Sequence, residues 1–100
     1  MKEADQRIAI AIADGWVQDK LRDFLWHKGT ETVPTAWLPN YPKDLNAMHE
    51  AEKLDSLNTD DYRENLATVY GRATARYDFE RASAANRAEA FLRTKNLWVE

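Results

Sequence analysis

The sequence contains no cysteine, only three glycines and only two histidines. The absence of cysteine excludes disulfide bridges, cysteine-based zinc sites and a catalytic thiol. Three glycines are too few for a glycine-rich loop that cradles phosphate groups. The longest apolar run is the short Ile and Ala alternation of residues 8–13, far below the ~20 residues that a membrane span needs. We therefore expect no cofactor, no metal site and no membrane partner.

Length and composition indicate one globular domain over residues 1–100. The chain is 44% hydrophobic and 31% charged, which is the balance of a folded chain rather than a disordered one. A domain of this size has enough residues for one hydrophobic core. No basic segment followed by an apolar segment opens the chain, so we expect no secretion signal and a cytoplasmic location.

The net charge of −3 is mild, but the charges are unevenly distributed. Residues 1–61 carry 12 acidic and 7 basic side chains, whereas residues 62–100 carry 5 acidic and 7 basic ones. Six of the seven basic residues in the second part are arginines, which suit two-point recognition of carboxylate and phosphate groups. The simplest interpretation is that these arginines form salt bridges with the acidic part.

Helical patterns with capping residues occupy much of the chain. We predict a helix over residues 5–14 with Asp5 as N-cap, and a second helix over residues 44–54 with Asp44 as N-cap. Gly15 stands where the first helix is expected to end.

Two further helices are predicted in the second half of the chain. A third helix is capped around Asn58 and repeats apolar residues through Tyr62, Leu66, Val69 and Ala73. A fourth helix follows Ser83, and its pattern buries Ala84, Ala88, Phe91 and Leu92.

The remaining segments contain the expected strands. Residues 16–33 fit either a helical stripe or a hairpin that turns at Lys28 and Gly29. Residues 34–42 contain three prolines and predict an extended connection. Residues 76–81 alternate and predict a short half-buried strand, and the apolar residues 97–99 form a tail that adds a strand or docks on the core. The sum is an α+β fold with helices packed on a small sheet.

The sequence contains no complete catalytic or zinc-binding motif. His49 and Glu50 resemble the start of the zinc motif H-E-x-x-H, but Lys53 occupies the position of the second histidine and a cation does not ligate zinc. Neither Ser56 nor Ser83 has the sequence context of a catalytic nucleophile. We therefore predict that the protein is not an enzyme.

The first binding hypothesis concerns a nucleotide. Arg72, Arg76 and Arg81 flank Tyr77 and Phe79, and arginine combined with stacking rings is the chemistry of nucleotide recognition. The competing interpretation is that the two rings lie on one face of a strand and belong to the core.

The second binding hypothesis concerns a protein partner. Tryptophan and arginine are enriched at the centres of protein interfaces, and the candidate anchors are Trp16, Trp26, Trp37 and Trp98. Trp26 and Trp37 are the preferred pair. A homo-oligomer formed through the apolar tail is also open.

Two segments resemble a known family. The stretch LPNYPKDLNAMHEAE (residues 38–52) and the stretch AANRAEAFLRT (residues 84–94), followed by Leu97 and Trp98, are similar to signatures of the phage ABA-sandwich domain family. Gly15 and Trp16 after an N-terminal helix match the opening of that family. The resemblance implies an α-β-α sandwich, with about four helices flanking both faces of a small sheet. It transfers no catalytic residue.

The resemblance suggests a setting in a bacterial host cell. The leading hypothesis is a non-enzymatic phage or prophage accessory protein that binds and inhibits a bacterial host protein complex, such as a CRISPR effector or another defence component. The alternative is a small-ligand module that sequesters an anionic nucleotide signal through the arginine-rich final third.

Overall fold

The computed structural model describes residues 1–54, 57–70 and 83–100. Its helices are α1 (Glu3–Ala13), η1 (Thr35–Trp37, a 3₁₀ turn), α2 (Leu45–Ala51), α3 (Thr59–Tyr70) and α4 (Ala84–Thr94). Its strands are β1 (Val17–Gln18), β2 (Leu25–Lys28) and β3 (Glu31–Pro34). The predicted α+β fold with a small sheet and four helices is confirmed. The strand predicted over residues 76–81 lies outside the described residues.

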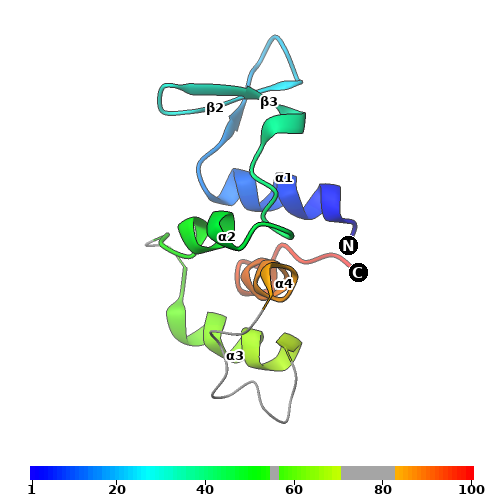
Figure 1. The fold of residues 1–100 in the computed structure, drawn as a ribbon, viewed down its shortest axis with the longest axis vertical. Coiled ribbons are helices and arrows are strands. Elements are labelled where there is room, and N and C mark those ends of the chain that lie inside the picture. Colours follow the sequence, from blue (N-terminus) through cyan, green and yellow to red (C-terminus); the bar gives the residue numbers. More distant parts are fainter. Residues whose placement is uncertain (55–56, 71–82) are drawn as a thin grey trace.

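The molecule is elongated, with extents of 48 × 26 × 22 Å. The sheet lies at one end of the long axis, and α1, α2, α4 and α3 follow it toward the other end (Figure 1). Helix α4 packs against α1, α2 and α3, so it is the centre of what we call the helical body, α1 to α4. No helix in residues 1–54, 57–70 and 83–100 is long and apolar enough to cross a membrane.

The sheet is antiparallel with strand order β1-β2-β3. Trp26 pairs with Val33 and Leu25 pairs with Pro34 across the β2–β3 hairpin. The hairpin turns at Gly29, whose φ of +60° is a left-handed conformation that glycine adopts without strain. Of the two alternatives for residues 16–33, the hairpin at Lys28 and Gly29 is confirmed and the helical stripe is wrong.

The caps predicted for three helices are confirmed. The Asp44 carboxylate accepts the backbone N–H groups of Asn46 and Ala47, Asn58 accepts that of Asp61, and Ser83 accepts that of Asn86. Each bond satisfies a donor that a helix start leaves unpaired.

Two helix boundaries differ from the prediction. Helix α1 starts two residues earlier than predicted, and the prediction of Asp5 as its N-cap is wrong, because Lys2 holds that position. Asp5 lies inside the first turn, where a carboxylate still complements the helix dipole. Helix α2 is shorter than predicted and stops at Ala51.

Gly15 ends α1 as predicted. Its φ is +103°, its N–H bonds the Ile12 carbonyl at 3.2 Å, and the Trp16 N–H bonds the Ala11 carbonyl at 3.0 Å. This pair of bonds is the Schellman motif, which needs a left-handed residue after the helix. It fixes the positions of Asp14 and Trp16 beside the hairpin.

The core is apolar and centred on α4. Its fully buried large side chains are Tyr41, Phe91, Ile10, Met48, Leu66 and Leu92. The predicted burial of Ala84, Ala88, Phe91 and Leu92 on α4 is confirmed. Trp98 in the C-terminal tail is partly buried against this core, and residues 97–100 form neither helix nor strand.

A partly buried polar cluster links two helices to the end of a third. The Arg87 guanidinium of α4 lies 2.7 Å from a carboxylate oxygen of Glu52, and the Tyr62 hydroxyl of α3 donates to the same oxygen at 2.6 Å. Burial, and then the hydrogen bond to Glu52, raise the pKa of Tyr62 far above its usual value. The cluster holds α3 and α4 to the residue that follows α2.

Candidate functional site

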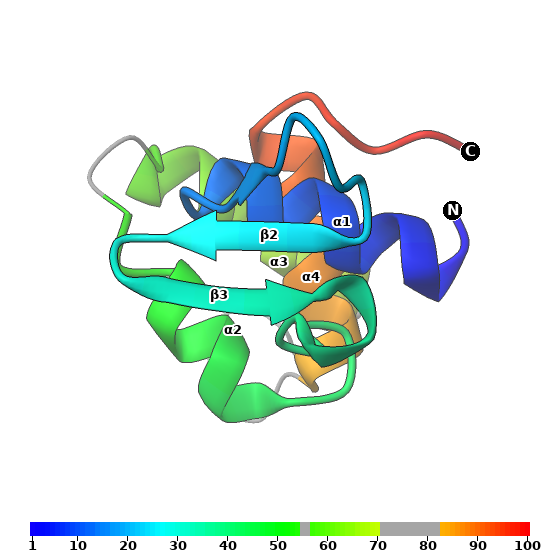
Figure 2. The same ribbon diagram turned by 90° about the horizontal axis from the view of Figure 1, so that it is seen from above.

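Large apolar side chains are exposed at one end of the sheet. Trp37 is 76% exposed, Phe24 57% and Leu21 94%. We call these three residues the sheet-end surface. The loop of residues 19–24 and η1, which carry them, lie at the same end of the β2–β3 hairpin (Figure 2). Exposed large apolar groups carried by segments at one end of a sheet make that end a candidate interaction site.

Hydrogen bonds hold the backbone on both sides of Trp37. The Arg7 guanidinium of α1 donates to the carbonyls of Ala36, at 3.2 Å, and of Leu38. Leu38 itself is buried in the core. Trp37 therefore projects into solvent from a short segment that is anchored to α1.

The preceding turn is fixed to the hairpin. The Thr35 N–H bonds the Phe24 carbonyl at 2.8 Å, and the Trp26 indole donates to the Thr35 hydroxyl at 2.9 Å. These bonds connect the backbone at Phe24 to the turn that carries Trp37, so one ordered unit presents both aromatic rings.

The loop that presents Leu21 is organised by Asp19. One Asp19 oxygen accepts the N–H groups of Leu21, at 2.8 Å, and of Arg22, at 3.0 Å. The other lies 2.7 Å from His27 Nε2. The hydrogen bond to His27, followed by those from the two backbone N–H groups, lowers the pKa of Asp19 to about 2.

Among residues 1–54, 57–70 and 83–100, neither histidine forms part of a larger ligand cluster. The other ring nitrogen of His27 contacts the Thr32 hydroxyl at 2.9 Å, so one nitrogen has a partner in β3 and the other in the loop that follows β1. His49 Nδ1, in α2, lies 3.2 Å from the carboxylate of Glu52, which caps the end of the same helix. In the part of the chain that the structure describes, no group of three or more His, Asp and Glu residues is placed to hold a metal ion.

The candidate residues predicted from the sequence differ in their exposure to solvent. Trp37 is exposed and central to the sheet-end surface, whereas Trp26 is only 4% exposed and belongs to the core. The prediction of Trp26 as a surface anchor is therefore wrong. Trp26 lies on the inner face of β2, toward the helical body, and supports the fold. Arg72, Arg76, Tyr77 and Arg81 lie outside the described residues.

Sequence reasoning missed Phe24 and Leu21. Both fit the helical stripe that is one of the two alternatives for residues 16–33, and a regular apolar spacing predicts burial. The signal that identifies them is the hairpin alternative: a strand that begins at Leu25 makes residues 19–24 a loop, and loops lie on the surface.

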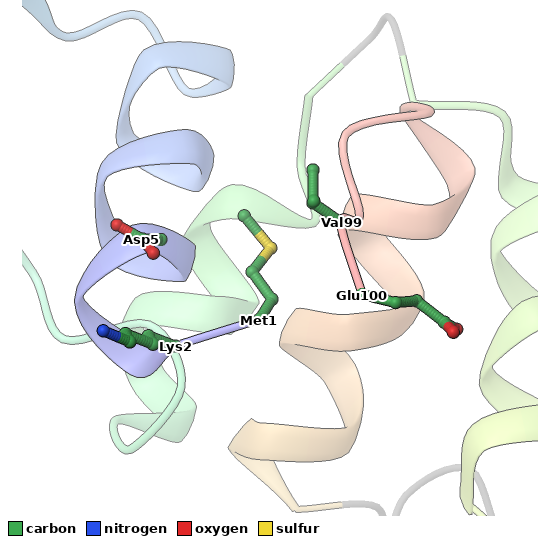
Figure 3. A pocket seen from close by; sticks show the side chains of 5 residues that line it. All are labelled: Met1, Lys2, Asp5, Val99 and Glu100. Atoms are coloured by element: carbon green, nitrogen blue, oxygen red, sulfur yellow. The ribbon is translucent and has the colours of Figure 1, made fainter.

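A shallow pocket of about 600 Å³ lies between the two termini of the described chain. Met1 and Val99 line its centre, while Lys2, Asp5 and Glu100 point away from it (Figure 3). Binding pockets usually combine apolar walls with converging polar groups, and the charged groups here diverge. It is therefore a weaker candidate than the sheet-end surface.

Comparisons with known proteins give no relative with which this site could be compared. No family model matches the sequence, and neither the curated proteins nor the solved structures give a match. The likeness to the phage ABA-sandwich family remains a prediction from residues 38–52 and 84–94.

Proposed function

We propose that this protein is a non-enzymatic binding module that docks onto a partner protein through the sheet-end surface. The observation that carries the proposal is Trp37, exposed to 76% on a backbone fixed by Arg7. A large ring on a rigid support loses little conformational freedom on binding, which is why such residues dominate interface energies.

The chemistry of the surface indicates the kind of partner. Two aromatic rings and Leu21 fit a partner with an apolar pocket that accepts an indole ring. The charged residues of the loop, Lys20, Arg22 and Asp23, are exposed beside them and supply the polar rim that such interfaces have. Pro34 ends β3, so addition of a partner strand at that edge is less favourable than side-chain docking.

The resemblance to phage proteins extends this proposal to a biological setting. On this view the protein is a phage or prophage accessory factor, and the partner is a bacterial host protein complex that it inhibits, such as a CRISPR effector or another defence component. The docking surface and the setting rest on separate arguments, so either can fail without the other.

The test is site-specific cross-linking followed by reconstitution. A photoreactive amino acid at position 37 captures a partner from host lysate, and the complex is rebuilt from purified components. We expect Trp37→Ala to weaken binding by about 30-fold, which corresponds to ~2 kcal/mol. The free energy of unfolding should change by less than about 0.5 kcal/mol, because the ring is exposed.

Val99→Ala is the matched control, because Val99 is an exposed apolar residue of the C-terminal tail. Unchanged affinity for Trp37→Ala, with a purified partner that binds the wild-type chain, would disprove docking through the sheet-end surface. Equal losses for both variants would indicate a general effect of surface apolarity rather than a site.

The alternative proposal is a module that sequesters an anionic nucleotide through Arg72, Arg76 and Arg81. It is supported by the excess of arginine in residues 62–100. Charge reversal at these three positions should abolish binding of a radiolabelled nucleotide while the circular dichroism spectrum is preserved. Retained nucleotide binding in a folded triple variant would overturn this alternative.

A further inference from the structure

A second pocket, of about 680 Å³, lies beside the turn of the β2–β3 hairpin. The turn is at the opposite end of the hairpin from η1 (Figure 2), so this pocket is separate from the sheet-end surface. Its lining residues come from the end of α1, the hairpin turn, the segment before α2, and α2: Asp14, Trp16, Lys28, Gly29, Thr30, Glu31, Pro39, Tyr41, Ala47 and Glu50.

The buried wall of the pocket holds a carboxylate. Asp14 is 9% exposed, and its Oδ2 accepts hydrogen bonds from the Tyr41 hydroxyl at 2.9 Å and from the Lys28 ammonium at 3.0 Å. Both donors use Oδ2, so Oδ1 takes part in neither bond. Burial, followed by the charge of Asp14, raises the pKa of Tyr41 far above its usual value, so Tyr41 stays a donor.

An aromatic ring completes a cation site around the Lys28 ammonium. Lys28 Nζ lies 6.0 Å from the centroid of the Trp16 ring, the outer limit of a cation–π contact. The Trp16 indole nitrogen is buried on the same wall of the pocket. Carboxylate, hydroxyl and ring together form the environment that recognises an organic ammonium or guanidinium group.

Lys28 enters this site from the surface. Its side chain is 43% exposed, and its stem passes over Gly15, where a Cβ atom would lie 3.9 Å from Lys28 Cε. A partly exposed lysine at the end of a strand can swing into solvent without moving the backbone, and doing so would uncover Asp14 and Trp16.

The charge of the pocket also favours a cation. Its lining includes three carboxylates (Asp14, Glu31 and Glu50) and one ammonium (Lys28), and Glu50 is also paired with Lys53 at 3.1 Å, which leaves a net charge of −1. Displacement of Lys28 by an incoming cation leaves the buried carboxylate paired, whereas an anionic ligand would add to the excess negative charge.

We propose that this pocket binds an aliphatic ammonium or guanidinium group and that Lys28 occupies it as an internal substitute in the ligand-free chain. The ligand is either a free amine or the lysine or arginine side chain of a peptide. Because the pocket lies at the other end of the hairpin, this inference does not rest on the proposed docking function.

The experiment measures binding of two probes, agmatine and a short acetylated peptide with one central arginine, by calorimetry and by NMR of the Trp16 indole N–H. Lys28→Met keeps the apolar stem but removes the competing charge. We expect at least one probe to bind Lys28→Met about tenfold more tightly than the wild-type chain. The reason is that Lys28 no longer occupies the pocket, so nearly all molecules can bind the probe. Preference for agmatine indicates a free amine, and preference for the peptide indicates a side chain.

Lys43→Met is the matched control, because Lys43 is an exposed lysine paired with Glu3 at 3.6 Å away from this pocket. It should bind both probes as the wild-type chain does. Asp14→Asn in the Lys28→Met background should abolish binding, and the Trp16 resonance verifies that this variant is folded. No binding of either probe to folded Lys28→Met, or binding that leaves the Trp16 indole resonance unmoved, would overturn the proposal.

Discussion

In the helical body, α4 is surrounded by three helices and buries Phe91 and Leu92 completely, whereas the outer end of the sheet leaves Trp37 and Leu21 mostly in solvent. Polar contacts strengthen the connection between the two regions, through Arg7 to η1 and through Asp14 to the hairpin. Apolar burial supplies most of the stability of a domain. The contrast therefore separates a region that stabilises the fold from a region whose apolar side chains remain free for a partner.

The largest expected difference between the two regions comes from matched aromatic truncations. Phe91→Ala removes a fully buried ring and should lower the free energy of unfolding by about 3–5 kcal/mol, because it loses apolar burial and leaves a cavity. Trp37→Ala removes a larger ring that is mostly solvated and should leave stability within about 0.5 kcal/mol of the wild type. Urea unfolding followed by circular dichroism measures both values.

This comparison fails if Trp37→Ala is destabilised by more than about 2 kcal/mol. Such a result would mean that the Trp37 ring packs against the protein in solution, and the sheet-end surface would then be part of the core.

The next prediction concerns the buried ion pair of the helical body. Arg87→Met leaves Glu52 partly buried without its cation and should cost about 3 kcal/mol. Lys53→Met breaks an exposed pair with Glu50 and should cost less than about 0.5 kcal/mol. Thermal unfolding of the two variants gives the comparison, and equal shifts in melting temperature would contradict the distinction between buried and exposed pairs.

The sequence predicted the helical body better than the sheet. Asp44, Asn58 and Ser83 are strong caps, and α4 has an apolar stripe that agrees with its burial, so local preference and tertiary packing coincide. Residues 16–33 were ambiguous because Leu21 and Phe24 match a helical period by chance. The turn at Gly29 and the pairing of β2 with β3 decide between the alternatives, and pairing is not a local property.

The candidate site was only half predictable, for a related reason. Composition identifies four tryptophans as anchors, but burial depends on which face of a strand each one occupies. Trp26 lies on the inner face of β2 and is buried, whereas Trp37 lies on a short 3₁₀ turn and is exposed. The Lys28 contact with Asp14 joins residues 14 positions apart, and no periodic pattern marks it.

The smallest expected effect is a pH dependence of stability that arises from Asp19, in the loop at the end of the sheet. Asp19 has a pKa of about 2 in the folded chain against a usual value of 3.8, chiefly because of its hydrogen bond to His27. A carboxyl whose pKa is lowered by folding stabilises the fold at pH values above its pKa in the unfolded chain. This contribution is lost as the pH falls through its pKa in the folded chain. The stability difference between wild type and Asp19→Asn should therefore be constant above about pH 5 and shrink as the pH falls from there toward 2.

Amide chemical shifts locate this effect within the molecule. The N–H groups of Leu21 and Arg22, which donate to Asp19, should titrate with a midpoint near pH 2 in the wild type and not in Asp19→Asn. Asp23→Asn in the same loop is the control and should leave that midpoint in place. Because α4 makes no hydrogen bond with this carboxylate, the amides of Phe91 and Leu92 should stay unshifted while the loop titrates. If the α4 amides instead move with the same midpoint, protonation of Asp19 is coupled to the whole domain, and the sheet end is not the separable region that its exposed surface suggests.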